Sequence, residues 1–161
     1  MKPEDTDRRL RTVEDMLAIH DVMVEYAIAA DSGDAELLRE LFVDDAVYEL
    51  DDLRIDGRDA IVATVLGRGP AGAEMLASAH TVGPAMVRVD GDQAVACGYS
   101  RLYVLEEDQS ISLRRLSFNR WEFVRDRTRW RIARRVVRAL GAADGPELVR
   151  NILAKRLPEG G

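Results

Sequence analysis

Cysteine and histidine are scarce in this chain of 161 residues, which has one cysteine and two histidines. A single cysteine excludes an internal disulfide and any metal site built from several thiolates. Two histidines leave little basis for a histidine-rich metal centre, so we expect no metal. The sequence also has no apolar run long enough to cross a bilayer and no apolar segment near its N-terminus. We therefore expect a cytoplasmic protein without a membrane span or a signal peptide.

The overall composition is that of one globular domain, with 47% hydrophobic and 32% charged residues. A chain of this length can bury one core with room for a modest internal cavity. The sequence contains no repeats, low-complexity segments or linkers. We expect a single domain over 1–161, with its core at about 10–140 and a C-terminal helical extension at about 145–157.

The net charge of −6 is distributed unevenly. Residues 1–60 carry 7 basic and 18 acidic side chains, whereas residues 112–138 carry 10 arginines and only two acids. The arginines alternate with apolar residues, which is typical of strands with one solvated face. We interpret them as surface residues paired with acids elsewhere in the fold. The acidic total agrees with that interpretation, and we expect no nucleic-acid partner.

The first half of the chain has helical spacing. Apolar residues recur every three to four positions from residue 8 to 30, which predicts a helix whose buried stripe holds Leu10, Val13, Leu17, Val24 and either Ala27 or Ile28. Asp34 is a suitable N-cap for a short helix over 35–42. A strand over 46–50, a third helix over 58–66 and a glycine-rich loop over 67–72 follow.

From His80 onward the hydrophobic period becomes two. Strands are predicted over 80–89, 93–105, 110–124 and 130–139, and Asp90-Gly91-Asp92 marks the first hairpin. Helices followed by a long antiparallel meander indicate an α+β fold. A long, strongly curved sheet wrapped over helices forms a cone that can hold a pocket.

Several segments together resemble the SnoaL-like branch of the nuclear-transport-factor-2-like (NTF2-like) superfamily over roughly residues 10–140. The segments are Tyr26 to Asp34, Leu41 to Ala46, Ile55 to Arg58, Phe118 to Trp121, and Trp130. The resemblance implies a cone of N-terminal helices on a curved antiparallel sheet. It does not fix a reaction, because the superfamily includes dehydratases, isomerases, epoxide hydrolases, polyketide cyclases and non-catalytic binders.

The resemblance to scytalone dehydratase-type lyases implies a catalytic Asp–His pair, at Asp31 and His80. Successive members of the series Leu17, Val24, Ala27 and Asp31 are separated by 7, 3 and 4 residues, which places Asp31 on the predicted buried stripe. A carboxylate there is costly unless it is paired. A carboxylate that accepts a proton from one imidazole nitrogen fixes the tautomer and raises the basicity of the other nitrogen. Such chemistry needs no cofactor.

The same resemblance points to weaker candidates for substrate binding. Asn119 lies 11 residues before Trp130, at the offset of a substrate-binding asparagine in scytalone dehydratase-like enzymes. Tyr26 falls at the position of an oxyanion-hole tyrosine in ketosteroid isomerase, and Tyr48 could also line the cavity. Ser100 occupies the position of a second histidine in the lyases, and its hydroxyl can donate a hydrogen bond but cannot act as a general acid.

At two points the sequence departs from the patterns of related enzymes, and each departure argues against one reaction. The isomerase base would be an aspartate where this chain has Leu50, and no Asp–Arg–Asp arrangement supports epoxide hydrolysis. We expect a cofactor-independent lyase or isomerase with dehydratase-like chemistry on a small apolar, cyclic hydroxy-carbonyl compound. The alternatives are a non-catalytic small-molecule-binding or assembly module and a polyketide cyclase-like enzyme.

The apolar residues of the meander cannot all face one small interior. We therefore expect a homo-oligomer, with a dimer favoured over a trimer and the sheet or the C-terminal segment at the interface.

Overall fold

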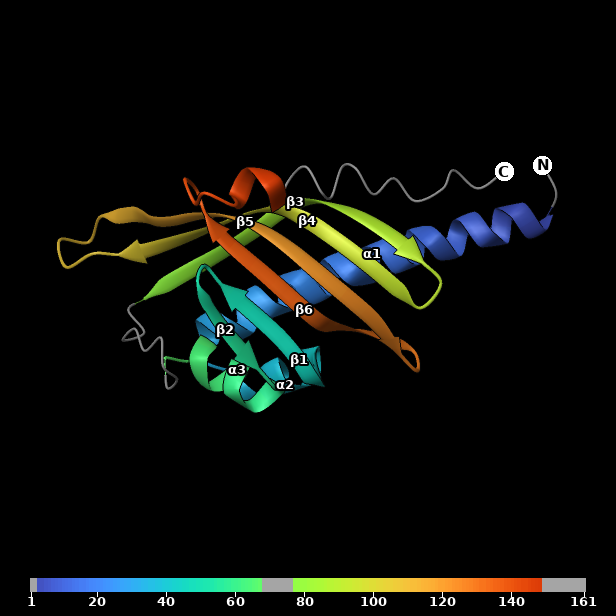
Figure 1. Cartoon of the computed structure of the whole chain (residues 1–161), viewed down its shortest axis with the longest axis horizontal. Helices are drawn as coiled ribbons and strands as arrows, with labels where there is room; N and C mark the ends of the chain where they lie inside the picture. The colour runs from blue at the N-terminus through green and yellow to red at the C-terminus, as the bar shows by residue number, and fades with distance from the viewer. Residues whose placement is uncertain (1–2, 68–76, 149–161) are drawn as a thin grey trace.

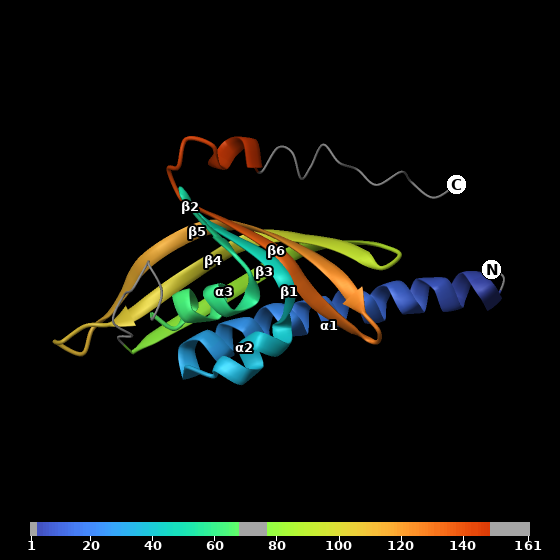
Figure 2. The same ribbon diagram turned by 60° about the horizontal axis from the view of Figure 1, so that its bottom comes forward.

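A computed structural model describes residues 3–67 and 77–148 of the chain. Three helices cover one face of a six-stranded sheet, as Figures 1 and 2 show. The helices are α1 (Pro3–Ser32), α2 (Ala35–Leu41) and α3 (Arg58–Val65). The strands are β1 (Phe42–Leu50), β2 (Leu53–Asp56), β3 (Ser78–Asp90), β4 (Gln93–Leu105), β5 (Ile111–Asp126) and β6 (Arg129–Ala139). The predicted α+β fold is confirmed.

Two predicted segments fall wholly or partly outside the described residues. A helical turn at 145–148 begins the expected C-terminal extension, and the rest of that extension lies outside them, as does the predicted loop after residue 67. None of the helices in the described ranges is long and apolar enough to span a membrane.

The sheet has the strand order β2-β1-β6-β5-β4-β3. Strands β3 to β6 form the predicted antiparallel meander, and β1 adds to it parallel to β6. Register shifts interrupt the β3–β4, β4–β5 and β5–β6 pairs. Such bulges bend the strands and increase their twist. The curved sheet therefore has a concave face toward the helices, where the core lies.

The predicted buried face of α1 is wrong. Leu10, Val13, Leu17, Val24 and Ile28 are all exposed, and only Ala27 of the predicted stripe is buried. The face that packs on the sheet carries Ile19, Met23, Tyr26 and Ala30 instead, at steps of four, three and four residues. The helix thus has two apolar stripes on opposite sides. The spacing of either is helical, so periodicity alone could not tell which one meets the sheet.

We expect Met23→Ala to lower the free energy of unfolding by about 2–5 kcal/mol, because it leaves a cavity in the core. Leu17→Ala is the matched control, since Leu17 lies on the same helix but is 59% exposed, against 2% for Met23. Its effect should stay within about 0.5 kcal/mol. Urea denaturation followed by circular dichroism measures both. Equal losses in the two variants would contradict the assignment of the buried face.

The arginines of β5 and β6 lie on both faces of the sheet. Those on the outer face pair with acids as predicted: Arg134 contacts Glu49 at 2.6 Å, and Arg120 contacts Glu122 at 2.8 Å. Arg135 contradicts the prediction, because it is buried on the concave face. The cause is a bulge in β6. Glu122 of β5 pairs with Arg134 and the next residue, Phe123, pairs with Ile132, so β6 has one extra residue between Ile132 and Arg134. Beyond this bulge, the residues of β6 face the side of the sheet opposite to the one that strict alternation predicts.

Candidate functional site

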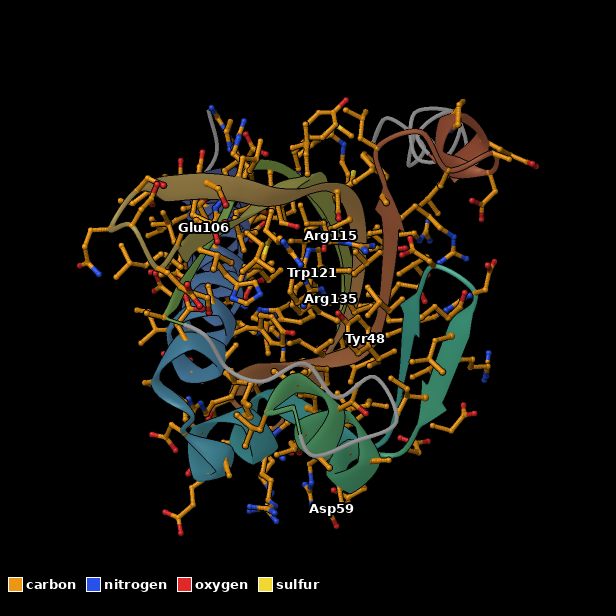
Figure 3. All side chains as sticks on the ribbon, turned by 90° about the vertical axis from the view of Figure 1, so that its left-hand side faces the viewer. Tyr48, Asp59, Glu106, Arg115, Trp121 and Arg135 are labelled. Carbon is orange, nitrogen blue, oxygen red and sulfur yellow. The ribbon has the colours of Figure 1, made fainter. Side chains whose placement is uncertain are left out.

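A cavity of about 150 Å³ lies within the cone, between the C-terminal half of α1 and the concave face of the sheet. The labelled side chains of Tyr48, Arg115 and Arg135 lie together in the interior of the fold in Figure 3. The polar side chains that line the cavity are those of Tyr26, Tyr48, His80, Ser100, Arg115, Ser117 and Arg135. The sequence-predicted residues Tyr26, Tyr48, His80 and Ser100 therefore come together at one place.

A larger hollow of about 950 Å³ runs along the outer face of the sheet. None of the predicted site residues lines it. Its arginines include Arg134 and Arg138, which both pair with Glu49, so these two charges are already matched within the sheet. The smaller cavity, which His80 and three other predicted site residues line, is the stronger candidate site.

His80 lines this cavity and forms a close pair with Asp31, which is not itself a lining residue. Asp31 lies in the last turn of α1 and His80 near the start of β3. His80 Nδ1 is 2.6 Å from Asp31 Oδ1, and the backbone N–H of His80 donates to Oδ2, also at 2.6 Å. The hydroxyl of Ser78 donates to Oδ1 at 3.2 Å. An ionised carboxylate only accepts hydrogen bonds, so the pair places the proton on Nδ1 and leaves Nε2 available.

The second histidine lies elsewhere. His20 Nε2 is 3.2 Å from the backbone carbonyl of Ala85, on β3, and His20 does not line the cavity. This contact ties α1 to the sheet.

Asn119 does not line the cavity, although its sequence position predicts a substrate contact. Its side chain is 1% exposed and lies behind the wall. Its amide nitrogen donates to Ser100 Oγ at 2.7 Å, and its Oδ1 accepts from Arg135 Nη2 at 2.8 Å. Since Ser100 Oγ accepts from Asn119, the hydroxyl proton of Ser100 remains free to donate. The geometry makes Asn119 a positioning residue for two groups that do line the cavity.

Two tyrosines line the same cavity. The ring of Tyr26 packs edge-on against Trp121, with ring centroids 5.3 Å apart. Burial raises the pKa of Tyr26 far above its usual value, and the nearby charge of Arg135 offsets only part of that shift. The Tyr26 phenol therefore keeps its proton and can serve as a hydrogen-bond donor. Tyr48 reaches the cavity from β1.

Arg115 and Arg135 also line the cavity, and neither was predicted from the sequence as a site residue. Arg115 donates to Ser117 Oγ at 2.7 Å and pairs with Asp51 at 2.7 Å. Burial by itself raises the pKa of Asp51, but hydrogen bonds from the Ala139 backbone and from Arg115 outweigh it and lower that pKa below its usual range. Asp51 stays ionised, so the Arg115 charge is neutralised within the protein.

The comparisons with known proteins agree on the family. Residues 11–136 match the SnoaL-like domain, so the chain belongs to the SnoaL-like family. It is similar to an NTF2-like protein with a cystatin-like fold from Novosphingobium aromaticivorans. The two share 35% identity over 92% of this chain and 97% of the other, with a TM-score of 0.82. No curated protein matches the sequence.

More distant structures share the fold alone. Rv3472 from Mycobacterium tuberculosis is 21% identical, with a TM-score of 0.74 over 96% of this chain and 92% of its own. A protein from N. aromaticivorans that carries the provisional name scytalone dehydratase is also 21% identical, with a TM-score of 0.62 over 80% of this chain and 85% of its own. The expected SnoaL-like, NTF2-like fold is confirmed.

Proposed function

We propose that the protein is a cofactor-independent lyase or isomerase that moves a proton on a small cyclic hydroxy-carbonyl compound. The single observation that carries this proposal is the 2.6 Å contact between His80 Nδ1 and Asp31 Oδ1 at the wall of the cavity. A binding module does not need an imidazole held in one tautomer by a carboxylate. A general base does, because the carboxylate holds the ring in the tautomer that leaves Nε2 to accept a proton, and it stabilises the imidazolium that forms.

In a dehydration, His80 Nε2 removes the proton beside the carbonyl group while Asp31 stabilises the imidazolium that forms. The C–O bond to the β-hydroxyl then breaks, a C=C bond forms, and the leaving hydroxide takes the proton from His80 and departs as water. Ser100 stands where lyases of the resembled type have a second histidine, so His80 serves as both base and acid. That double role favours departure of the proton and the hydroxyl from the same face of the ring.

The hydroxyl groups of Tyr26, Tyr48 and Ser100 are the donors available for the oxygens of the substrate. The raised pKa of Tyr26 keeps its phenol protonated, and a hydrogen bond between Tyr26 and Tyr48 links two of these hydroxyls in the wall of the cavity. A donor aimed at the carbonyl oxygen stabilises the negative charge that develops there when the proton leaves. Asn119 holds Ser100 from behind and does not itself touch the substrate.

The size of the cavity favours this proposal over a cyclase. About 150 Å³ is the volume of a site that holds one six-membered ring, as an engineered cavity of that size in another protein does. A polyketide cyclase requires a larger and flatter cavity than this. The likeness to a protein provisionally named scytalone dehydratase is, at 21% identity, a likeness of fold.

The proposal is tested by proton exchange and by turnover. Monocyclic ketones and β-hydroxy ketones are incubated with the protein in D₂O. Proton NMR then follows deuterium incorporation beside the carbonyl, and absorbance follows the conjugated product of water loss. We expect exchange or water loss above the buffer rate for part of this panel. A full panel with neither would favour the non-catalytic binding module.

A further inference from the structure

Arg135 is a buried cation without an acidic partner in the part of the chain that the structure describes. Its side chain lines the cavity and the residue is 3% exposed. Its Nε and Nη2 both donate to the neutral amide oxygen of Asn119, at 3.1 and 2.8 Å. By contrast, the other arginine of the cavity, Arg115, pairs with Asp51.

The surroundings of Arg135 compensate its charge only in part. Its guanidinium carbon lies 4.0 Å from the centroid of the Trp121 ring and 4.3 Å from that of Tyr26, with Tyr48 at 5.3 Å. Aromatic faces attract a cation, but they do not neutralise it. Tyr26 keeps its proton because burial raises its pKa, so it is not a counter-anion.

No carboxylate lines the cavity among the residues that the structure describes, and Asp31, which contacts His80, is already occupied. Asp31 accepts hydrogen bonds from Ser78 and from both the backbone and the ring of His80. A buried cation that lacks an ionic partner is costly to the fold, because burial removes its hydration. The cavity therefore has an unmatched positive charge at Arg135. A guanidinium has five N–H donors, of which two are used on Asn119 and one on Tyr26, so Arg135 retains donors for a ligand.

We propose that the natural ligand of this cavity is a molecule of about one ring that carries an ionised oxygen, and that this oxygen binds to Arg135. The ionised oxygen belongs to a carboxylate or to an acidic enol or phenol. The inference rests on the proposed function for the choice of cavity, and it adds the charge and the size of the ligand. The anion supplies the partner that the fold does not, and a charge-assisted hydrogen bond to Arg135 selects it over neutral molecules of the same shape.

The test is a binding experiment that requires no turnover. Benzoate and 4-nitrophenol are compared with benzamide and nitrobenzene, which are neutral molecules of similar size, by calorimetry and by quenching of tryptophan fluorescence. We expect the anions to bind at least about tenfold more tightly. Bound 4-nitrophenol should also show the absorbance of its phenolate at a lower pH than it does in solution. Tight benzoate binding identifies a carboxylate ligand, and tight nitrophenolate binding identifies an acidic enol or phenol.

Three variants test whether Arg135 is the residue that causes the preference for anions. Arg135→Gln should lose the preference for anions, whereas Arg134→Gln should keep it, since Arg134 is the neighbouring arginine on the outer face and pairs with Glu49. Arg135→Lys retains the charge and should keep a reduced preference, which covers the case in which the glutamine variant does not fold. Equal affinity of the wild-type protein for charged and neutral probes would overturn the inference, and so would an undiminished preference in Arg135→Gln.

The His80→Ala variant separates this inference from the proposed function. It should bind benzoate or nitrophenolate as selectively as the wild-type protein, because His80 is not part of the anion contact. Loss of anion selectivity in His80→Ala with Arg135 intact would contradict the assignment of the charge to Arg135. If the wild-type protein shows no turnover but still binds anions through Arg135, the inferred anion site stands and the proposed lyase function is wrong.

Discussion

The His80→Ala variant should lose proton exchange beside the substrate carbonyl by a factor of about 10²–10⁴, the usual contribution of a positioned general base. Alanine removes the imidazole but keeps the backbone N–H of residue 80, which donates to Asp31 Oδ2. The side chain of His80 is 29% exposed, so its loss creates no closed cavity in the core. We therefore expect the free energy of unfolding to change by less than about 1 kcal/mol. NMR exchange rates in D₂O and urea denaturation measure the two effects.

His20→Ala is the matched control for this variant. It removes the other histidine, which contacts the backbone of β3 and does not line the cavity. Its exchange rate should equal that of the wild-type protein, with a loss of stability of about 1 kcal/mol from the missing hydrogen bond. If His80→Ala retained full activity, or if His20→Ala lost as much, His80 would not be the proton carrier.

The Asp31→Asn variant should lower the same exchange rate by about 10²–10⁴, because an amide cannot stabilise the imidazolium that forms when His80 takes a proton. The amide is close in shape to the carboxylate, so the contacts with Ser78 and with the His80 backbone can be kept in part. Nitrogen NMR of the imidazole provides a second measurement. The wild-type protein should show the proton of neutral His80 on Nδ1, and the asparagine variant should lose that fixed tautomer.

Asp34→Asn provides the control for a carboxylate at the end of α1. Asp34 Oδ1 accepts from the backbone N–H groups of Glu36 and Leu37 and thereby caps α2. Asparagine is an equally good N-cap, so stability and exchange rate should both be unchanged. If the Asp31→Asn variant kept the normal exchange rate and the same His80 tautomer, the Asp31–His80 contact would be structural and not catalytic.

The sequence predicted most of the secondary structure because that structure has a local cause. The alternation after His80 gave the four strands of the meander, and Asp34 marked the start of α2 correctly. The boundaries shifted where tertiary contacts extend an element. Strand β1 begins at Phe42, four residues before the predicted start, because Phe42 pairs with Ile132 across the parallel contact with β6. That pairing joins residues that are 90 positions apart in the sequence, so no local sequence pattern predicts it.

The candidate site was predicted in part. The resemblance to scytalone dehydratase-type lyases pointed to Asp31 and His80, and the structure brings these side chains within hydrogen-bond distance. Their chemical roles remain predictions. Asn119 was expected to bind substrate, yet it supports Ser100 and Arg135 from behind. Arg135 was missed because the bulge in β6 places it on the concave face, whereas the alternation from Trp130 and Ile132 would direct it outward.

Scarcity of cysteine and histidine was the most restrictive property of the sequence. It excluded an internal disulfide, and it left His80 as the one histidine available to the proposed chemistry once His20 was found against the Ala85 carbonyl. The first conclusion follows from composition and does not depend on how the chain folds, whereas the second also needs the position of His20 in the structure. The helical and strand periods are likewise properties of neighbouring residues.

Faces and registers were decided by the tertiary structure alone. Helix α1 carries an apolar stripe through Leu17 and another through Met23, and only contact with the sheet selects the second for burial. In the same way, the pairing of β5 with β6 decides that Arg135 enters the cavity and Arg134 does not. The physical reason is common to both cases. A periodic pattern fixes which residues share a face, whereas contacts between segments distant in the sequence fix which face meets the core.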